Sequence, residues 1–283
     1  MPQPLIELIN NSDKLTLAIS PANGFVPQVY LPMLRPLAND YHIVSVPPRA
    51  LWGDRAPPEN YADYSWLNVA EDMITAYETF DLKNVVAIGH SIGAVTTLLA
   101  TLQRPDLFKA IILLDPVILP KMATDWMREQ IKQGNIINQP MIEGALRRRN
   151  KFKSIDDAFD NYHGKSIFAD WSDEVLRLYV THGTVECDDG LRCLAWSPQW
   201  EAFYFGTYYV DIWTAIHRFT TIDVPTLIVN GSDSDTFQPQ TVNDVKGILS
   251  KADFDTVEGH GHLFPQSAPQ ATADVIQAWL SKI

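Results

Sequence analysis

Residues 84–100 spell NVVAIGHSIGAVTTLLA, and this stretch decides the fold class. Its first part, Asn84 to Ile88, is a β-branched apolar run that favours a buried strand. Its last part, with Thr96 to Leu102, continues as a helix that ends near Pro105. Between the two stands Gly89-His90-Ser91-Ile92-Gly93, a G-x-S-x-G pattern. The stretch predicts a strand that turns sharply into a helix, with a serine on the turn.

The same alternation of strand and helix extends to both sides of this turn. Continuous apolar runs predict strands at Leu15 to Ser20, Tyr41 to Val46, Ala110 to Leu114, Thr226 to Asn230 and Phe254 to Val257. Helical spacing predicts helices at Gln28 to Leu37, Trp66 to Phe80, Gln240 to Leu249 and Ala268 to Leu280. This order predicts an α/β fold, a mostly parallel sheet with helices on both faces.

The middle of the chain differs from its two ends. Residues 116–223 carry little strand signal and hold 16 of the 30 Phe, Trp and Tyr residues. So long and aromatic a segment is not a loop. We expect a helical cap inserted at 116–223 into a core made of residues 1–115 and 224–283. Most of the aromatic residues should form the core of the cap, and a minority should line an apolar pocket.

The G-x-S-x-G turn is suited to nucleophilic chemistry. A serine hydroxyl needs exposure and a nearby base to attack a carbonyl carbon. Glycines two positions on either side remove the Cβ atoms that would collide in so tight a turn. The helix that follows directs its N-terminal N–H groups at developing negative charge. Ser91 is therefore the candidate nucleophile.

With these motifs the sequence resembles the α/β-hydrolase family over Leu15 to Asp115 and Pro225 to Ile283. The resemblance implies that nucleophile, acid and base follow in the order Ser, acid, His along the chain. It also implies that the insertion is a cap over the site. Family members usually show two strands before the first long one, whereas here only residues 5–9 are a candidate.

The resemblance places the acid in the loop after Thr226 to Asn230, which reads GSDSDTFQP from Gly231 to Pro239. Family members look like strand-G-x-x-D-x-x-x-P. The spacing to the proline favours Asp235, whereas the spacing from the glycine is one residue longer than usual and leaves Asp233 as the alternative. Asp115, at the end of an earlier strand, ranks third. The acid would hold the imidazole tautomer and stabilise the imidazolium.

The base and the oxyanion hole follow from two further loops. Gly259-His260-Gly261-His262 resembles the family's G-x-G-H loop, which makes His262 the candidate base. One oxyanion donor should be the N–H of Ile92, directly after the serine. The other should come from the loop after the first long strand. There the family often shows His-Gly-x and this chain has Asn23-Gly24-Phe25, so the Phe25 N–H is the candidate.

Substrate contacts are expected from Gly24, His90 and Trp213. A basic run in the insertion comprises Arg147-Arg148-Arg149, Lys151 and Lys153. We read this run as a solvated helix face, with anion recognition as the alternative. No G-x-G-x-x-G, P-loop or metal-ligand spacing is present, so we expect neither a cofactor nor a bound metal.

Charge, hydropathy and cysteine content limit the binding partners and the cellular compartment that we expect. The net charge is −12, which disfavours nucleic acid as a partner, and no apolar run approaches membrane-spanning length. Cys187 and Cys193 are the two cysteines; we expect reduced thiols, with a local disulfide as the alternative. With no signal peptide at the start, the expected location is cytoplasmic. Assembly into a homo-oligomer is left open.

These features predict a serine hydrolase that acts through an acyl-enzyme at Ser91. The resemblance implies a carboxylesterase, because esters are the commoner substrates of the family, and the aromatic residues of the cap favour small to medium apolar carboxylic esters. One alternative keeps the triad and changes the bond, as in a thioesterase, a perhydrolase or a hydrolase of C–C bonds of the meta-cleavage type. Another is a hydrolase-like small-molecule receptor without significant turnover. An aspartate at position 91 would favour a dehalogenase or an epoxide hydrolase, so serine disfavours both.

Overall fold

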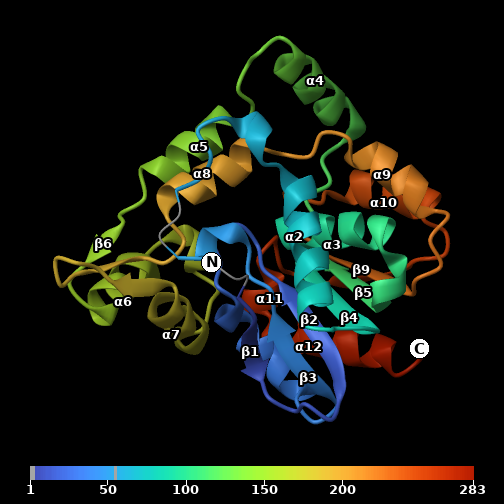
Figure 1. Cartoon of the computed structure of the whole chain (residues 1–283), viewed down its shortest axis with the longest axis horizontal. Helices are drawn as coiled ribbons and strands as arrows, with labels where there is room; N and C mark the ends of the chain where they lie inside the picture. Colours follow the sequence, from blue (N-terminus) through green and yellow to red (C-terminus); the bar gives the residue numbers. More distant parts are fainter. Residues whose placement is uncertain (1–3, 54–55) are drawn as a thin grey trace.

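A computed structural model describes residues 4–53 and 56–283 of the chain. Its centre is a seven-stranded sheet with the strand order β1-β3-β2-β4-β5-β9-β10 (Figure 1). The strands are β1 (Ile6–Ile9), β2 (Leu15–Ser20), β3 (Tyr41–Ser45), β4 (Val85–His90), β5 (Phe108–Leu114), β9 (Thr226–Gly231) and β10 (Asp253–Val257). Each long predicted strand is present, within one or two residues of its predicted bounds.

All neighbouring strands run parallel except β1, which pairs antiparallel with β3. At the centre, Gly89 of β4 lies opposite Ser20 of β2 and Leu113 of β5. The carboxyl ends of three strands therefore meet at one edge of the sheet, where α/β proteins place their ligands.

Helices cover both faces of the sheet, because side chains alternate along each buried strand. Leu17 and Ile19 of β2 point into one apolar cluster and Ala18 into the other. One face is covered by α2 (Trp66–Thr79), α3 (Ile92–Gln103), α9 (Ile212–Phe219) and, through Val245, α10 (Pro239–Ile248). The other face is covered by α1 (Leu31–Leu34), α11 (Phe264–Ser267) and α12 (Pro269–Leu280). This arrangement confirms the predicted fold class.

The segment predicted as one helix over Gln28 to Leu37 is divided into three short pieces. They are η1 (Pro27–Tyr30), α1 and η2 (Arg35–Leu37). Pro32 and Pro36 stand near the starts of the second and third pieces. Proline lacks the backbone N–H that a continuous helix needs, so the run is broken at each of them. The other 3₁₀ turns are η3 (Arg49–Leu51), η4 (Tyr61–Asp63), η5 (Pro105–Leu107) and η6 (Ser166–Phe168).

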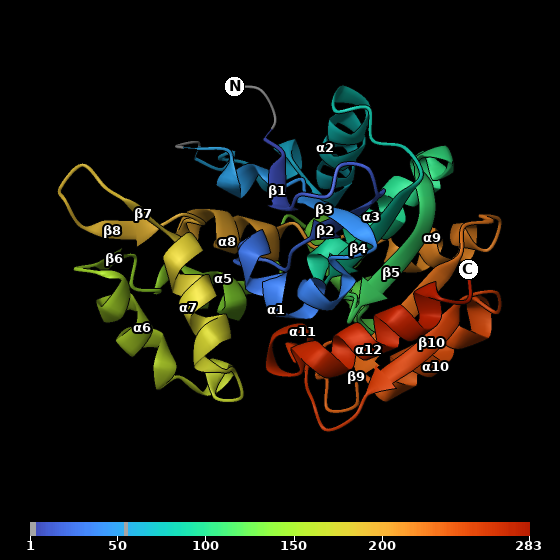
Figure 2. The ribbon, with the colours of Figure 1, turned by 90° about the horizontal axis from the view of Figure 1, so that it is seen from below.

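The segment between β5 and β9, which we call the cap, is mostly helical. Its helices are α4 (Lys121–Lys132), α5 (Gln139–Leu146), α6 (Ile155–His163), α7 (Asp173–His182) and α8 (Pro198–Gly206). Helix α5 packs against α8, and α7 packs against η1 of the core. In Figure 2 the pair α6 and α7 lies to one side of α1, away from α10 and α12.

Two details of the insertion differ from the prediction. Helix α9 lies inside 116–223 but packs against α3 and α10 of the core, as Figure 1 shows. The cap also holds a small antiparallel sheet of three short strands in the order β6-β8-β7. They are β6 (Lys151–Phe152), β7 (Thr184–Glu186) and β8 (Arg192–Leu194), and strands of two or three residues leave no readable alternation in a sequence.

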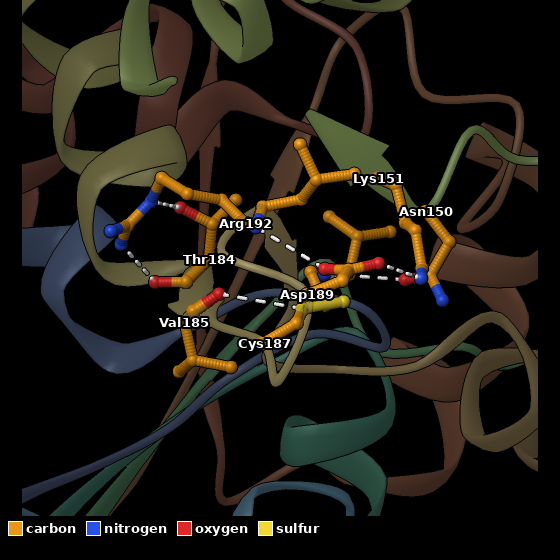
Figure 3. Close-up of a disulfide and its surroundings, with 10 residues drawn as sticks. Asn150, Lys151, Thr184, Val185, Cys187, Asp189 and Arg192 are labelled. Atoms are coloured by element: carbon orange, nitrogen blue, oxygen red, sulfur yellow. Dashed lines mark hydrogen bonds and ion pairs between the residues drawn. A yellow bond between two sulfur atoms is a disulfide. The ribbon is translucent and has the colours of Figure 1, made fainter. Parts of the chain in front are cut away.

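The two cysteines are joined, in contrast to the expectation of reduced thiols. A disulfide links Cys187 and Cys193 across the hairpin of β7 and β8, where their Cα atoms are 5.9 Å apart (Figure 3). Ion pairing between Lys151 and Asp189 and hydrogen bonds from Arg192 to Thr184 surround it. The hairpin brings the two residues into the range that a disulfide requires, which six residues of spacing alone do not show.

No helix within residues 4–53 and 56–283 is long and apolar enough to cross a bilayer.

Candidate active site

Ser91 stands on a strained turn between β4 and α3. Its backbone adopts φ 60° and ψ −121°, a left-handed conformation that is rare for residues other than glycine. A Cβ atom at Gly89 would collide with the backbone of Gly93, and one at Gly93 would collide with the carbonyl oxygen of Ser20. Both glycines are therefore required by the tightness of the turn, as the G-x-S-x-G pattern predicts.

His262 reaches Ser91 from the loop between β10 and α11. The Ser91 Oγ lies 3.0 Å from the His262 Nε2, a hydrogen bond in which the hydroxyl donates to the imidazole. The two residues are 171 positions apart in sequence, and the sheet brings them together. This contact joins the two residues that the sequence motifs select as nucleophile and base.

Asp115 is the carboxylate that contacts His262. The His262 Nδ1–H donates to the Asp115 Oδ2 at 2.6 Å, and the Asp115 side chain is fully buried at the end of β5. Two further donors satisfy the carboxylate: the Gly231 N–H at 3.0 Å on Oδ1 and the Ser234 Oγ–H at 2.5 Å on Oδ2. A buried carboxylate with three such hydrogen bonds is held in one orientation.

The structure therefore corrects the predicted contact of Asp235 with His262. Asp235 and the alternative Asp233 are both exposed, and their carboxylates accept hydrogen bonds from the neighbouring Thr236 and Ser232. The third position after Gly231, where family members look like G-x-x-D, is held by Ser234. Its hydroxyl binds Asp115 instead, so the carboxylate that contacts His262 follows β5 and still lies between Ser91 and His262 along the chain.

The loop after β2 also differs from the prediction. The Phe25 N–H donates to the Ala22 carbonyl oxygen at 3.1 Å and is not free to bind an oxyanion. The Ala22 N–H donates to the Tyr30 hydroxyl at 2.9 Å. Among the described residues, the N–H groups of Asn23 and Gly24 have no partner in the protein. Ile92, by contrast, begins α3 as predicted, where an N–H has no carbonyl of its own helix to bind.

A cavity of about 540 Å³ opens above Ser91, between the core and the cap. Apolar side chains form most of its wall: Phe25, Trp66, Ile92, Val117, Leu119, Met141, Ile167, Phe168, Phe205, Tyr208 and Leu263. Five cap aromatics are in this wall, whereas others such as Trp200 and Phe203 pack in the interior; the five are Tyr162, Phe168, Tyr179, Phe205 and Tyr208. The cavity is large enough for a small to medium substrate.

A polar cluster from the cap lies at one side of this cavity. The Arg148 guanidinium pairs with the Glu201 carboxylate and donates to the hydroxyls of Tyr162 and Tyr179. Burial raises the pKa of Glu201, and the charge of Arg148 opposes that rise. The Asn23 side-chain amide donates to the Glu201 carbonyl oxygen at 3.0 Å, so the cluster also holds the loop after β2.

The basic run is thus divided between two environments. Arg148 is largely buried beside the cavity, whereas Arg147 and Arg149 are exposed and pair with Glu143 and Asp157. The predicted solvated face describes the outer residues of the run.

The residues predicted to contact a substrate lie outside the cavity wall. Gly24, with φ 80°, packs against Glu201 and Arg148. His90 is fully buried behind the turn. Trp213 packs in the core on α9 and donates its indole N–H to the Leu119 carbonyl oxygen at 3.0 Å. The residues that sequence reasoning missed are Asn23 and Ser234. The position of Ser234, three after the strand-end glycine, was the available signal.

No group of three or more His, Cys, Asp or Glu side chains within the described part of the chain is arranged to hold a metal ion.

Comparison with known proteins places this geometry in context. The model of the family described as "Alpha/beta hydrolase family" matches residues 21–275 of the chain. The matched range covers the turn at Ser91, the carboxylate of Asp115 and the loop of His262.

Individual relatives are distant in sequence. The (E)-2-((N-methylformamido)methylene)succinate hydrolase of Acinetobacter baylyi is 20% identical over 91% of this chain and 87% of that protein. Among solved structures, E-2-(acetamidomethylene)succinate hydrolase has a TM-score of 0.75 at 17% identity, covering 98% of this chain and 94% of the other. The thioesterase domain from the curacin biosynthetic pathway has a TM-score of 0.72 at 17% identity, covering 95% and 92%. These structural likenesses show the fold.

Proposed function

Because this chain belongs to the alpha/beta hydrolase family, we propose that its hydrolase activity is that of a serine carboxylesterase acting through an acyl-enzyme at Ser91. The observation that carries the proposal is the continuous chain of hydrogen bonds from Ser91 through His262 to the buried Asp115. Ser91 and His262 both face a largely apolar cavity, where a hydroxyl and an imidazole in contact have few other uses.

In the first half of the reaction, Ser91 attacks the ester carbonyl carbon while His262 Nε2 takes the hydroxyl proton. The Asp115 carboxylate holds the Nδ1–H tautomer and stabilises the imidazolium that forms. The negative charge on the carbonyl oxygen is held by two backbone N–H groups, those of Ile92 and Asn23. We place Asn23 in the role predicted for Phe25, because its N–H is free and it lines the cavity beside Ser91.

In the second half, His262 returns its proton to the departing alkoxide, which leaves as an alcohol. A water molecule then enters, and His262 removes its proton as it attacks the acyl carbon. When the second oxyanion collapses, the bond from the acyl carbon to the Ser91 Oγ breaks and His262 returns the proton to that oxygen, which releases the carboxylic acid and restores the Ser91 hydroxyl. Each oxyanion donor contributes about 10²–10³-fold to kcat in such reactions.

The substrate proposed is an ester with an apolar acyl or alcohol part of short to medium length. The wall of the cavity supports this proposal, since most of the residues in it present carbon to a ligand. Relatives and structural neighbours named as succinate-derivative hydrolases and a thioesterase fit the same hydrolytic chemistry on other acyl groups. Thioesters are therefore the comparison substrate of choice.

Fluorophosphonate labelling tests the proposal. The wild-type protein should become covalently labelled, and Ser91→Ala should not. A series of p-nitrophenyl esters should then show the highest kcat/KM for acyl chains that fit the cavity. A wild-type protein that neither labels nor releases p-nitrophenol would contradict the esterase and favour a hydrolase-like protein that only binds its ligand. Equal rates on charged and apolar esters would contradict the proposed substrate class.

A further inference from the structure

His90, the residue between Gly89 and Ser91, makes two hydrogen bonds that the catalytic chain does not use. Its side chain is fully buried. Its Nε2 lies 2.9 Å from the carbonyl oxygen of His262, and its Nδ1 lies 2.7 Å from the hydroxyl of Tyr30. Neither His90 nor Tyr30 is in the cavity wall, so these bonds are not made for a substrate.

The chemistry of the partners assigns the ring protons of His90. A carbonyl oxygen only accepts, so the His90 Nε2 carries hydrogen and the Nδ1 keeps a lone pair. The Tyr30 O–H must then donate to Nδ1, and the Tyr30 oxygen accepts the N–H of Ala22 at 2.9 Å. Burial raises the pKa of Tyr30, and burial followed by the charge of His262 lowers the pKa of His90. Both side chains therefore stay neutral and keep this one arrangement.

The group joins three segments that the proposed mechanism needs in register. Ala22 precedes Asn23, whose N–H is the proposed oxyanion donor. His90 precedes the nucleophile, and His262 is the base. The hydrogen bonds run from the backbone of Ala22 through two side chains to the backbone of His262, with no water needed. An apolar pair of the same size would fill the space without fixing the two loops relative to each other.

We propose that His90 and Tyr30 are positioning residues, which hold the base loop and the oxyanion loop at the distances that acyl transfer requires. This inference rests on the proposed function, because it assigns a role in the same reaction. A shift of about 1 Å in such a site costs about 10²-fold in rate. We therefore expect the loss to be in kcat and in the rate of serine labelling, with KM nearly unchanged.

The variant Tyr30→Phe removes one hydroxyl and keeps the ring. Tyr77→Phe is its matched control, because Tyr77 is equally buried on α2 beside Phe108, on the opposite face of the sheet. We expect Tyr30→Phe to lower kcat and the fluorophosphonate labelling rate by about 10- to 100-fold. Tyr77→Phe should change neither by more than about twofold.

Two further measurements separate positioning from simple stability. The single variant His90→Gln should lose about as much activity as Tyr30→Phe. The double variant of His90→Gln with Tyr30→Phe should lose about as much as either single variant, because the effects of substitutions within one hydrogen-bonded group are not additive. Side-chain ¹⁵N NMR of the wild-type protein should show His90 as the neutral Nε2–H tautomer near neutral pH.

The outcomes distinguish this inference from the proposed function. A wild-type protein that is not labelled contradicts the esterase, and the NMR result then still tests the arrangement at His90. A labelled wild-type protein together with Tyr30→Phe at the activity of Tyr77→Phe overturns the positioning role. An Nδ1–H tautomer, or a charged His90 near neutral pH, overturns it as well.

Discussion

Two loops leave neighbouring strands of the sheet at the same edge, and they treat their carboxylates in opposite ways. The loop after β5 begins with Asp115, which is buried and receives three hydrogen bonds. The loop after β9 carries Asp233 and Asp235, which are exposed and bind neighbouring hydroxyls. A histidine is supported by the carboxylate that is removed from water and oriented, and the number of acidic residues nearby matters little.

The two loops begin at nearly the same place, at the carboxyl ends of neighbouring strands. Strands β5 and β9 are parallel neighbours, with Leu114 opposite Val229. A carboxylate leaving either strand end can therefore reach the same imidazole. Here the β9 loop supplies the Ser234 hydroxyl in place of a carboxylate, and it points at the acid supplied by β5. Changing one loop at a time tests this comparison.

The largest effect is expected for Asp115→Asn. The amide keeps the shape but favours the wrong imidazole tautomer, so kcat on p-nitrophenyl acetate should fall by about 10⁴-fold. The circular dichroism spectrum, recorded as a function of pH, would verify that the variant is folded. A loss of less than tenfold would show that another carboxylate, or none, supports His262.

The next effect is a gain, and it tests whether the two loops are interchangeable. Starting from Asp115→Asn, the added change Ser234→Asp places a carboxylate at the third position after Gly231. We expect it to recover roughly tenfold or more of the lost kcat, within the range of pairwise couplings in one network. The control is Asp115→Asn with Ser234→Asn, which has the same size and no charge. Equal activity of the two double variants would show that the β9 loop cannot supply the acid.

A smaller loss is expected for Ser234→Ala alone. Removing this hydroxyl takes one hydrogen bond from the Asp115 carboxylate, and a hydrogen bond to a charged group is worth about 1.5–3 kcal/mol, or at least tenfold if it acts fully on the transition state. Steady-state kcat would measure it. Ser250→Ala, exposed before β10 at the far end of the sheet, should leave kcat unaltered. An unchanged Ser234→Ala would mean that His262 and Gly231 suffice to hold the acid.

The smallest effect is expected for Asp235→Asn. Its side chain is exposed and its hydrogen bond is to the adjacent Thr236, so kcat should remain within about twofold of wild type. The same ester assay serves for this variant. A loss above tenfold would reverse the comparison and return the acid to the β9 loop.

Local sequence patterns predicted the sheet well because each strand carries its own signal. Buried parallel strands are continuous apolar runs, and the turn at Ser91 needs glycines that are visible in the sequence. The contact between Ser91 and His262 could be expected for the same reason, since each has a motif on its own loop. The prediction of one helix over 28–37 was wrong at Pro32 and Pro36. The two prolines were a visible sign of a break, and the apolar spacing was given more importance.

The acid could not be predicted with equal security. Asp115, Asp233 and Asp235 all follow strands, and no local pattern tells which of the three will be covered by neighbouring loops. That depends on Gly231 and Ser234 approaching from a strand more than 100 residues away. The same limit applies to His90, whose partners Tyr30 and His262 come from opposite ends of the chain.

The contact of Glu201 with Asn23 and Gly24 has a consequence for the size of substrate that the proposed esterase can hydrolyse. Any widening of the cavity that lifts α8 must break the bond from the Asn23 amide and loosen the backbone beside it. A substrate too large for the cavity would then bind next to Ser91, while the backbone N–H of Asn23 would no longer be in position to bind the oxyanion. A substrate that is too large would therefore be cleaved more slowly without binding much more weakly. The preference for substrate size would appear in kcat.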